Sequence, residues 1–573
     1  MFFDFQVDVP DARGLLVQKK RGNYYSIEYE YDRVYDPVKK YTYPKRAMIG
    51  RHEKKDDPKM YPNQNFLKYF PDAQMPDALD RTVRSPYLNV GTYMVLEKII
   101  NAYKLPEMLG KYMSMKDAGL LLDLACYSII TEGNAAQYYP DYAYCHPLLT
   151  NNMKIYSDSK ISDFLRELGP EQSVGFLNSW HESRNHREKI YISYDSTNKG
   201  CQAGDIDIVE YGHPKVDEGI PVFNYSVAYD VTNKEPLFYE KYPGSINDIS
   251  QLRSAVDKAY SYGYRKLAFI LDRGYFSREN ITYLDRNGYS FVIMVKGMKK
   301  FIRPIILDQM GTFENKRIRY IERYDVYGTT VTMPMYEGDE VDRSIHLYYS
   351  DVRAVKEKQR VKEKIRKMKK YLDAFVEKER VFGPGFEEYF YLHYEDDGVT
   401  FKLAEEKTGV VETELSLCGY FSIITSEKMT AREAINLYKS RDASEKLFRS
   451  DKSFLGNKSL RIDGNDAASS KIFIEFIALI LRCRLYTCLK EKYESISEKP
   501  NYLTVPAAIR ELEKIAMIRQ LDGVYRLDHA VTKQEKVILD AFGLSDNNIR
   551  IRAEKLGQLL DKIMNHPKKG GKE

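Results

Sequence analysis

The sequence predicts an α/β protein with a central sheet of mixed strand direction, preceded by a helical region and interrupted by a β-rich insertion. Two observations favour this class. Apolar residues change from helical spacing to strict alternation near residue 190, and several predicted strands are followed by predicted helices. The chain has 573 residues, more than one hydrophobic core usually supports. We therefore expect about three to five structural units.

Residues 1–85 are predicted to form a small β-containing or irregular module. They are rich in Tyr, Pro and Lys and include the strand-like run NYYSIEYEYDRVYD. Residues 37–60 carry eight Lys or Arg against three acidic residues. This charge suits a polyanionic partner, but proteins that never bind one often have a similar surface.

A helical region is expected over residues 86–185. The runs TYMVLEKIINAYKLPEMLGKYM and AGLLLDLACYSIITEG place apolar residues three and four apart, as on the buried face of a helix. In SDSKISDFLREL, Ser and Asp stand where helix caps are expected.

The strands of the central sheet begin within residues 186–300. KIYISYD, PVFNYSVAYD, PLFYEKYPG, KLAFILD and SFVIMVK have the apolar content and spacing of strands. A helix from about Ser277 to Arg286 separates the last two. Strands and helices in this order predict a mixed α/β sheet.

The second half of the chain divides into three predicted regions. Residues 301–425 contain further strand candidates around a basic helix and are predicted as an inserted β-rich domain. Residues 426–500 return to helix, which begins at a capping box formed by Thr430 and Glu433. Residues 501–573 are predicted as a helical C-terminal region ending in a tail.

Several observations exclude whole classes of protein. The most apolar run, IFIEFIALILRCRLYTCL, contains Glu475, Arg482 and Arg484, so it predicts a buried helix and no membrane partner. The start MFFDFQVDVPDARG lacks the basic and apolar parts of a signal peptide, which makes the cytoplasm the expected compartment. The six cysteines form no close CxxC pair, so no zinc site is expected.

A concentrated positive segment runs from Arg353 to Lys370, with ten basic residues against Glu357 and Glu363. Such a segment attracts phosphates and releases their counterions. A solvated charged helix would have the same composition, and the sequence leaves both interpretations open.

Candidate catalytic residues stand at the ends of two predicted strands and on one predicted helix. Asp195 ends KIYISYD and Asp272 ends KLAFILD, and strand ends of this kind place side chains in a shared crevice. The helix that begins at the capping box presents five residues on one face, because they are spaced by three and four. They are Tyr438, Arg441, Glu445, Phe448 and Lys452.

Three carboxylates suit chemistry with divalent metal ions. Mg²⁺ prefers a few carboxylate oxygens with water and substrate phosphate, and two such ions about 3.5–4 Å apart can hold an in-line displacement at phosphorus. Cations on the Glu445 helix would hold flanking phosphates. A plainer interpretation stays open, since an Asp at a strand end is usually a turn residue and polar residues at helical spacing usually form an exposed face.

Longer stretches around these residues resemble the motifs of bacterial insertion-sequence DDE transposases, in particular the group named for its Tyr-Arg-Glu-Lys signature. The motifs are YDSTN around Asp195, LDRGYFS around Asp272, and Tyr438-x2-Arg441-x3-Glu445-x6-Lys452. YGHPK, PGSINDIS, FVIMVKG and GYFSIITSEKMT are further similarities, in the expected order. The resemblance covers about residues 90 to 545.

The resemblance implies a ribonuclease-H-like catalytic core with a β-rich insertion between the second Asp and the Glu, preceded by a helical DNA-binding region. It implies an enzyme that binds the terminal inverted repeats of an insertion sequence and catalyses metal-dependent DNA cleavage and strand transfer. Asp195, Asp272 and Glu445 would be the catalytic and metal-binding residues, with two ions of Mg²⁺, or Mn²⁺ in its place. Double-stranded DNA would be the partner, both as element ends and as target. A homodimer would process both ends at the nucleoid in a bacterial cytoplasm.

Further residues are expected to contact DNA. By resemblance, Tyr438, Arg441 and Lys452 would correspond to phosphate contacts near the cleaved end. Lys296 leaves a predicted strand near the site, where a solvated lysine is the alternative. Arg273 flanks Asp272 and is expected at least to shape its crevice. His213, in a loop beside Pro, is more simply explained as structural.

Two other functions stay open at this point. One is a DNA-binding protein descended from a transposase, and the other is a nuclease that cuts DNA without joining it. The intact acidic triad argues against the first. Integration of cut ends into target DNA would exclude the second.

Overall fold

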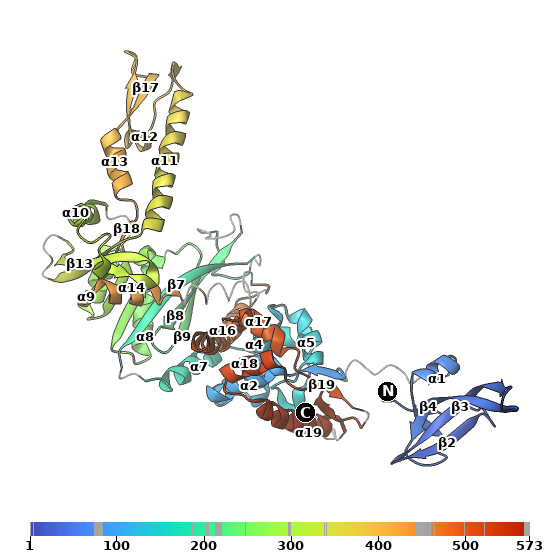
Figure 1. Ribbon diagram of the computed structural model, residues 1–573. Helices are drawn as coiled ribbons and strands as arrows, with labels where there is room; N and C mark the ends of the chain where they lie inside the picture. The colour runs from blue at the N-terminus through green and yellow to red at the C-terminus, as the bar shows by residue number, and fades with distance from the viewer. Residues whose placement is uncertain are drawn as a thin grey trace. The chain divides into compact units, whose positions relative to one another are not determined.

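The computed structural model describes most of the chain (Figure 1). The described residues are 2–3, 5–73, 84–185, 188–201, 205–211, 220–246, 248–295, 299–336, 339, 341–442, 446, 455, 460–462, 464–497, 499–520 and 522–565. They belong to two compact units, one of Met1–Gln172 with Ser469–Glu573 and one of Ser173–Ala468.

The N-terminal part of the first unit is an antiparallel sheet with strand order β1-β5-β4-β3-β2. Its strands are β1 (Val7–Asp8), β2 (Leu16–Arg21), β3 (Tyr24–Asp36), β4 (Tyr41–His52) and β5 (Lys59–Pro62). One helix, α1 (Gln64–Tyr69), adds Phe66 to the core of this sheet, which also contains Ile27, Ile49 and Met60. The run NYYSIEYEYDRVYD forms β3, as the sequence predicts.

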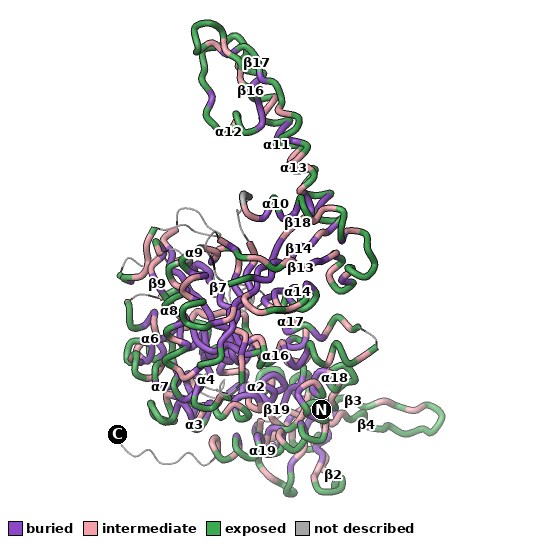
Figure 2. The backbone as a smooth tube through the Cα atoms, turned by 90° about the vertical axis from the view of Figure 1, so that its left-hand side faces the viewer, coloured by how far each residue is buried: buried purple, intermediate pink, exposed green. Residues whose placement is uncertain are grey.

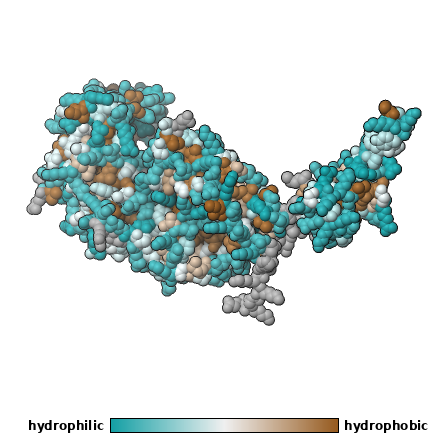
Figure 3. Space-filling model, turned by 60° about the horizontal axis from the view of Figure 1, so that its bottom comes forward, coloured by the Kyte–Doolittle hydropathy of each residue, from teal (hydrophilic) through white to brown (hydrophobic). Residues whose placement is uncertain are grey.

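The rest of the first unit is mostly helical, in agreement with the spacing of its apolar residues. Its helices are α2 (Gly91–Ala102), α3 (Leu105–Leu109), α4 (Met115–Thr131), α5 (Tyr139–Cys145), α6 (Asp158–Glu167), most of α16 (Asn465–Ser495), α17 (Val505–Leu512), α18 (Lys533–Ala541) and α19 (Asp546–Asn565). None of the helices in the described part of the chain is both long and apolar enough to cross a membrane. The face of the molecule in Figure 3 is mostly hydrophilic, with scattered hydrophobic side chains.

A small sheet joins segments that lie far apart in the sequence. β6 (Tyr87–Asn89) pairs with β19 (Ala516–Arg519), which pairs with β20 (Tyr525–Leu527). Residues 86–172 and 501–573, for which the sequence predicts separate regions, therefore share one unit, whereas residues 173–185 of the predicted helical region belong to the other. Pairing between such distant segments leaves no trace in local periodicity.

The second unit contains a nine-stranded mixed sheet with strand order β12-β13-β14-β18-β11-β10-β7-β8-β9. Its strands are β7 (Ile190–Gly200), β8 (Val222–Asp230), β9 (Glu235–Pro243), β10 (Leu267–Leu271), β11 (Ser290–Met294), β12 (Tyr320–Ile321), β13 (Val326–Pro334), β14 (Asp342–Tyr349) and β18 (Tyr420–Thr425). β7, β8 and β9 are antiparallel, whereas β10 is parallel to β7 and β11 is parallel to β10. This arrangement confirms the predicted mixed strand direction.

Helices connect the parallel strands and cover the sheet (Figure 1). They are α7 (Pro170–Glu182) before β7, α8 (Asp248–Ser261) before β10, α9 (Arg278–Arg286) before β11, and α10 (Lys299–Gln309) after it. Every residue of β8 and β10 is buried. Burial on both faces explains why β10, LAFIL, is a continuous apolar run, whereas β8 also buries the polar residues Asn224, Ser226 and Asp230.

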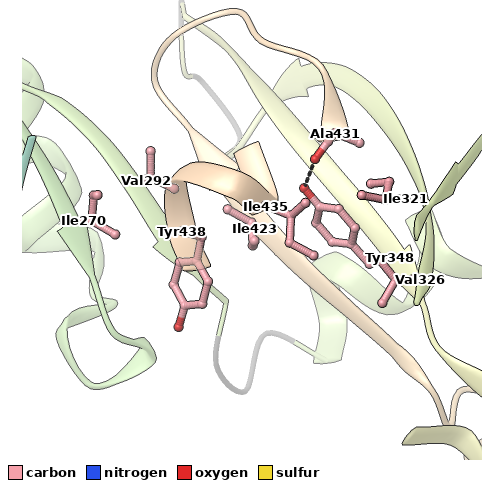
Figure 4. Packing of buried hydrophobic residues seen from close by; sticks show 9 residues of the cluster. All are labelled: Ile270, Val292, Ile321, Val326, Tyr348, Ile423, Ala431, Ile435 and Tyr438. Atoms are coloured by element: carbon pink, nitrogen blue, oxygen red, sulfur yellow. Dashed lines mark hydrogen bonds between the residues drawn. The ribbon is translucent and has the colours of Figure 1, made fainter. Parts of the chain in front are cut away.

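Helix α14 (Ala431–Lys439) packs against the sheet (Figure 4). Ile435 and Tyr438 on the helix belong to one core cluster with Ile270 of β10 and Ile423 of β18. The Tyr348 hydroxyl donates a hydrogen bond of 2.7 Å to the carbonyl oxygen at the start of α14. These contacts hold the helix beside the strands that carry the candidate site.

The segment predicted as an inserted β-rich domain, residues 301–425, is divided between two structures. β12, β13, β14 and β18 extend the nine-stranded sheet beyond β11. Residues 351–416 form a separate small structure from α11 (Asp351–Asp373), β15 (Lys378–Glu379), α12 (Pro384–Glu387), β16 (Phe390–Tyr394), β17 (Thr400–Glu406) and α13 (Thr408–Ser416). Leu372, Phe390 and Phe401 lie in its own core. The predicted boundaries therefore include strands of the main sheet, because alternation does not show which strands pair.

Candidate active site

Two aspartates lie beside each other where neighbouring parallel strands part. β10 pairs with β7 in a register that sets Leu271 opposite Tyr194, and each aspartate is the next residue along its chain segment. Neighbouring strands lie about 4.8 Å apart, so this register brings the carboxylates of Asp195 and Asp272 together. Strand register thus explains why these two residues, which the sequence predicts to share a crevice, lie close together.

Asp195 does not end its strand, contrary to the sequence prediction. β7 continues to Gly200 because β8 pairs with it over that whole stretch. Only the pairing with β10 stops at Tyr194. Asp272, as predicted, directly follows the last residue of β10, where its carboxylate accepts a hydrogen bond of 2.7 Å from the backbone N–H of Arg273.

Arg441 lies between the two carboxylates. Its Nη1 atom is 3.8 Å from Asp195 Oδ2 and 3.6 Å from Asp272 Oδ1. The Arg441 side chain is 10% exposed, and those of Asp195 and Asp272 are 19% and 35% exposed. A cation this close to two partly buried carboxylates offsets their mutual repulsion.

Tyr438 contacts the same site from α14. Its ring is buried in the cluster of Figure 4, and its hydroxyl donates toward Asp272 Oδ1 at 3.4 Å. The same hydroxyl lies 3.7 Å from the sulfur of Met294. Because 3.4 Å is long for an O–H···O hydrogen bond, the contact is weak, and packing of the ring holds Tyr438 in place. The Arg441 guanidinium carbon lies 5.5 Å from the centroid of the Tyr438 ring, a cation–π distance.

The helix that carries Tyr438 is shorter than the sequence predicts. It begins at the predicted capping box of Thr430 and Glu433 but ends at Lys439. Arg441 lies in a turn before the next helical residue, Asp442. This turn, rather than a continuous helical face, places Arg441 between the carboxylates.

Some predicted site residues lie outside the described part of the chain. They are Glu445, Lys452 and Lys296, and His213 lies outside it as well. The structure thus brings together Asp195, Asp272, Tyr438 and Arg441. The third carboxylate and the two lysines stay predictions.

Arg273 lines a pocket beside the carboxylates. Three more arginines line it, namely Arg303 of α10 and Arg353 and Arg360 of α11, together with Phe421 of β18. The Arg353 guanidinium carbon lies 4.9 Å from the Phe421 ring centroid. The sequence singles out Arg273 and the basic segment that contains Arg353 and Arg360, but it predicts neither Arg303 nor the meeting of the four side chains, because no spacing relates residues from these separate elements.

The donor set is compatible with a divalent metal ion. No cluster of three or more His, Cys, Asp or Glu side chains suited to a metal ion occurs among the residues that the structure describes. However, Mg²⁺ commonly takes only one or two carboxylates, with water and substrate phosphate as its other ligands. The partly exposed carboxylates of Asp195 and Asp272 provide this share.

A family model described as "Transposase DDE domain" matches residues 192–481. The chain belongs to the DDE transposase family. It is therefore an enzyme of a class that cleaves DNA and transesterifies its strands, and the family generally uses divalent metal ions. All four residues that the structure brings together lie within the matched range.

The comparisons with curated proteins and with solved structures add little to this family assignment. No curated protein matches the sequence of this DDE transposase. Among solved structures, it is similar to a piggyBac transposase in a synaptic complex with hairpin DNA, with 9% sequence identity and a TM-score of 0.32 over 88% of this chain and 82% of that chain. A TM-score this low does not establish a common fold.

Proposed function

We propose that the chain binds the terminal inverted repeats of an insertion sequence, cleaves DNA there, and transfers the freed strands to target DNA. The observation that carries this proposal is that Asp195 and Asp272 lie together where the parallel strands β7 and β10 cease to pair, with Arg441 between them. Together with Glu445, these aspartates are the proposed catalytic residues. The mixed sheet that presents them supports a ribonuclease-H-like core.

The carboxylates of Asp195 and Asp272, with Glu445 as the proposed third ligand, would hold Mg²⁺ or Mn²⁺, as two ions. When bound, such ions polarise phosphoryl oxygens and make bound water or a hydroxyl a better nucleophile. Arg441 faces the same space with a planar group of five N–H donors, which suits a phosphate oxygen of the reacting strand. Tyr438 is a further proposed phosphate contact, and its hydroxyl donates only weakly to the Asp272 carboxylate.

DNA flanking the reacting phosphate would contact the basic residues around the site. Arg273 supports this because its exposed side chain lines a pocket with three other arginines. Lys296 and Lys452 are proposed contacts from their places in the sequence. The helical region 86–185 is the proposed reader of the inverted repeats, and a homodimer would process the two ends together at the nucleoid of a bacterial cytoplasm.

The test is cleavage of a duplex carrying the inverted repeats that flank the gene, with Mg²⁺ or Mn²⁺ present. Asp195→Asn, Asp272→Asn and Glu445→Gln each remove one charge with little change of shape. We expect each to lower the cleavage rate on the order of 10³-fold while DNA binding is retained. Asp308→Asn, at an exposed position of α10, is the matched control and should cleave like the wild type.

The outcomes separate the three candidate functions. Undiminished cleavage by Asp272→Asn would contradict the catalytic assignment. Cut products without integrants, when target DNA is supplied, would indicate a nuclease. DNA binding without cleavage by the wild-type protein would indicate a DNA-binding descendant of a transposase.

A further inference from the structure

The hairpin of β3 and β4 is much longer than the other strands of the N-terminal sheet. β3 has 13 residues and β4 has 12, whereas β2 has six and β5 has four. β2 pairs with β3 only as far as Tyr29, and β5 pairs with β4 only at Gly50 and Arg51. β3 and β4 nevertheless stay paired up to Asp36 and Tyr41 at the turn. Residues 31–46, called the outer ribbon below, are therefore a two-stranded extension of the sheet.

The outer ribbon does not belong to a hydrophobic core. None of its residues, all of which the structure describes, is buried, and Val38 at the turn is 88% exposed. Figure 2 shows the end of this hairpin as exposed. A two-stranded ribbon without a packed face is only marginally stable in water. Packing within the sheet therefore gives no reason for its length.

The outer ribbon carries an excess of positive charge. Its basic residues are Arg33, Lys39, Lys40, Lys45 and Arg46, against the acidic Asp32 and Asp36. Asp36 accepts hydrogen bonds of 2.9 and 3.0 Å from the backbone N–H groups of Val38 and Lys39, which order the turn. Lys39 and Lys40 form no ion pair with any residue in the described ranges. Two adjacent lysines thus stand at the tip of an ordered turn.

Exposed tyrosines alternate with these cations. They are Tyr31, Tyr35, Tyr41 and Tyr43. The Tyr31 ring stacks on Tyr69 of α1 at a centroid distance of 5.1 Å, which steadies the base of the ribbon. Tyrosine hydroxyls, like lysine and arginine, are common hydrogen-bond partners of DNA phosphates. The surface therefore combines charge and hydrogen bonding that fit a polyanion.

We propose that the outer ribbon binds double-stranded DNA, with Lys39 and Lys40 contacting phosphates and the two strands lying along a groove. A two-stranded β-ribbon fits the major groove, which is roughly 12 Å wide. Charge decides between DNA and a second copy of the chain, because two such ribbons would repel each other. The inference goes beyond the proposed function, since this surface carries none of the catalytic carboxylates. It depends only on the fact that enzymes of this family act on DNA.

The test compares two charge reversals in the full-length protein. Lys39→Glu/Lys40→Glu changes the ribbon tip, and Lys54→Glu/Lys55→Glu makes the same charge change at exposed positions between β4 and β5. The probe is a mixed-sequence DNA duplex, titrated at several KCl concentrations. For the tip variant we expect affinity to fall about tenfold or more at 0.1 M salt, and the slope of log K against log[salt] to flatten by about 1.8. The control should stay within about twofold of the wild type.

Several results would overturn the proposal. If both variants lose affinity for DNA equally, DNA is attracted to the positive charge of the whole module and not to the ribbon. If neither variant loses affinity, the ribbon does not contact DNA. If the molar mass of the tip variant, measured by light scattering, differs from that of the wild type, the ribbon contacts a second copy of the chain. Circular dichroism and melting temperature confirm that the variants fold. Asp272→Asn should lower the cleavage rate on the order of 10³-fold without changing this binding, so failure of the catalytic proposal is distinguishable from failure of this one.

Discussion

Arg441 shows how much a single residue's role depends on its surroundings. The resemblance of its motif implies a phosphate contact, whereas the structure places it within 4 Å of both candidate carboxylates. The two roles are compatible. A guanidinium can offset the repulsion of two carboxylates before DNA binds and face a phosphate afterwards, because its donors point in several directions.

Substitution of Tyr438 separates packing from chemistry. Tyr438→Phe keeps the ring among Ile270 and Ile423 and removes only the hydroxyl beside Asp272. We expect the free energy of unfolding to change by less than about 1 kcal/mol and DNA cleavage to slow up to about tenfold. Tyr438→Ala would also leave a cavity and lower stability by about 3–5 kcal/mol. Urea unfolding measures the change in stability, and cleavage rates measure the change in activity. Equal destabilisation by the two variants would contradict the view that the ring supplies packing and the hydroxyl does not.

His346 of β14 is buried in the sheet as a neutral side chain. Its Nδ1 lies 2.9 Å from Thr330 Oγ1 and its Nε2 lies 3.0 Å from Thr425 Oγ1. The Thr425 hydroxyl donates its only hydrogen to the Glu427 carbonyl oxygen at 2.7 Å, so Nε2–H of His346 donates to Thr425. Nδ1 then accepts from Thr330. Burial lowers the pKa of His346 to about 4.

This histidine makes stability fall in acid. Above pH of about 6.5 it is neutral in both the folded and the unfolded chain, so it contributes no pH dependence. Between about pH 6.5 and pH 4 only the unfolded chain takes up the proton, which lowers the free energy of unfolding by about 3 kcal/mol in total. His346→Gln should therefore lose less stability between pH 7 and pH 5 than the wild type. His393→Gln, at an exposed histidine, is the control and should follow the wild-type curve.

At the scale of elements, the start of α14 could be predicted and its end could not. Thr430 and Glu433 form the capping box within four residues, so the signal is local. No Gly or Pro marks the end at Lys439, and the spacing of three and four continues through Arg441. No local signal therefore marks the end of this helix.

Helix α11 contains the basic segment, Arg353 to Lys370, that the sequence offers as a phosphate-binding surface. Three of its cations have partners on the same helix: Arg353 with Glu357, Lys367 with Glu363 and Lys369 with Asp373. Lys362 and Arg366 lie one turn apart, exposed, and form no ion pair with any residue in the described ranges. If this face tracks phosphates, Lys362→Glu/Arg366→Glu should weaken binding to all duplex sequences equally and flatten the salt slope by about 1.8.

The control for α11 is the same charge change at Lys54 and Lys55, far from it in the sequence. Binding measured over a series of salt concentrations distinguishes the two variants. An unchanged slope for the α11 variant would restore the interpretation of a solvated charged helix.

At the scale of the whole molecule, residues 351–416 should unfold separately from the nine-stranded sheet. β14 and β18 pair directly, so the small structure between them adds no strand to that sheet. Phe390→Ala removes a fully buried ring from its core and should cost about 3–5 kcal/mol there. Hydrogen exchange should then quicken only within 351–416.

The complementary variant changes the main sheet. Ile270→Ala in β10 removes a fully buried side chain and should quicken exchange across the nine-stranded sheet, not in residues 351–416. Faster exchange in both regions for either variant would show that they unfold as one cooperative structure.

Local patterns in the chain were enough to predict the helical and strand runs, the capping box at Thr430, the position of Asp272 after its strand, and the motifs that resemble DDE transposases. These features depend on residues close together in the sequence. Folding was needed to set Asp195 beside Asp272 through strand register, to bring Arg441 between them, to add β12–β14 and β18 to the main sheet, and to pair β6 with β19. Such arrangements follow from hydrogen bonding and burial between distant segments, and the spacing of neighbouring residues carries no record of which distant segments will meet.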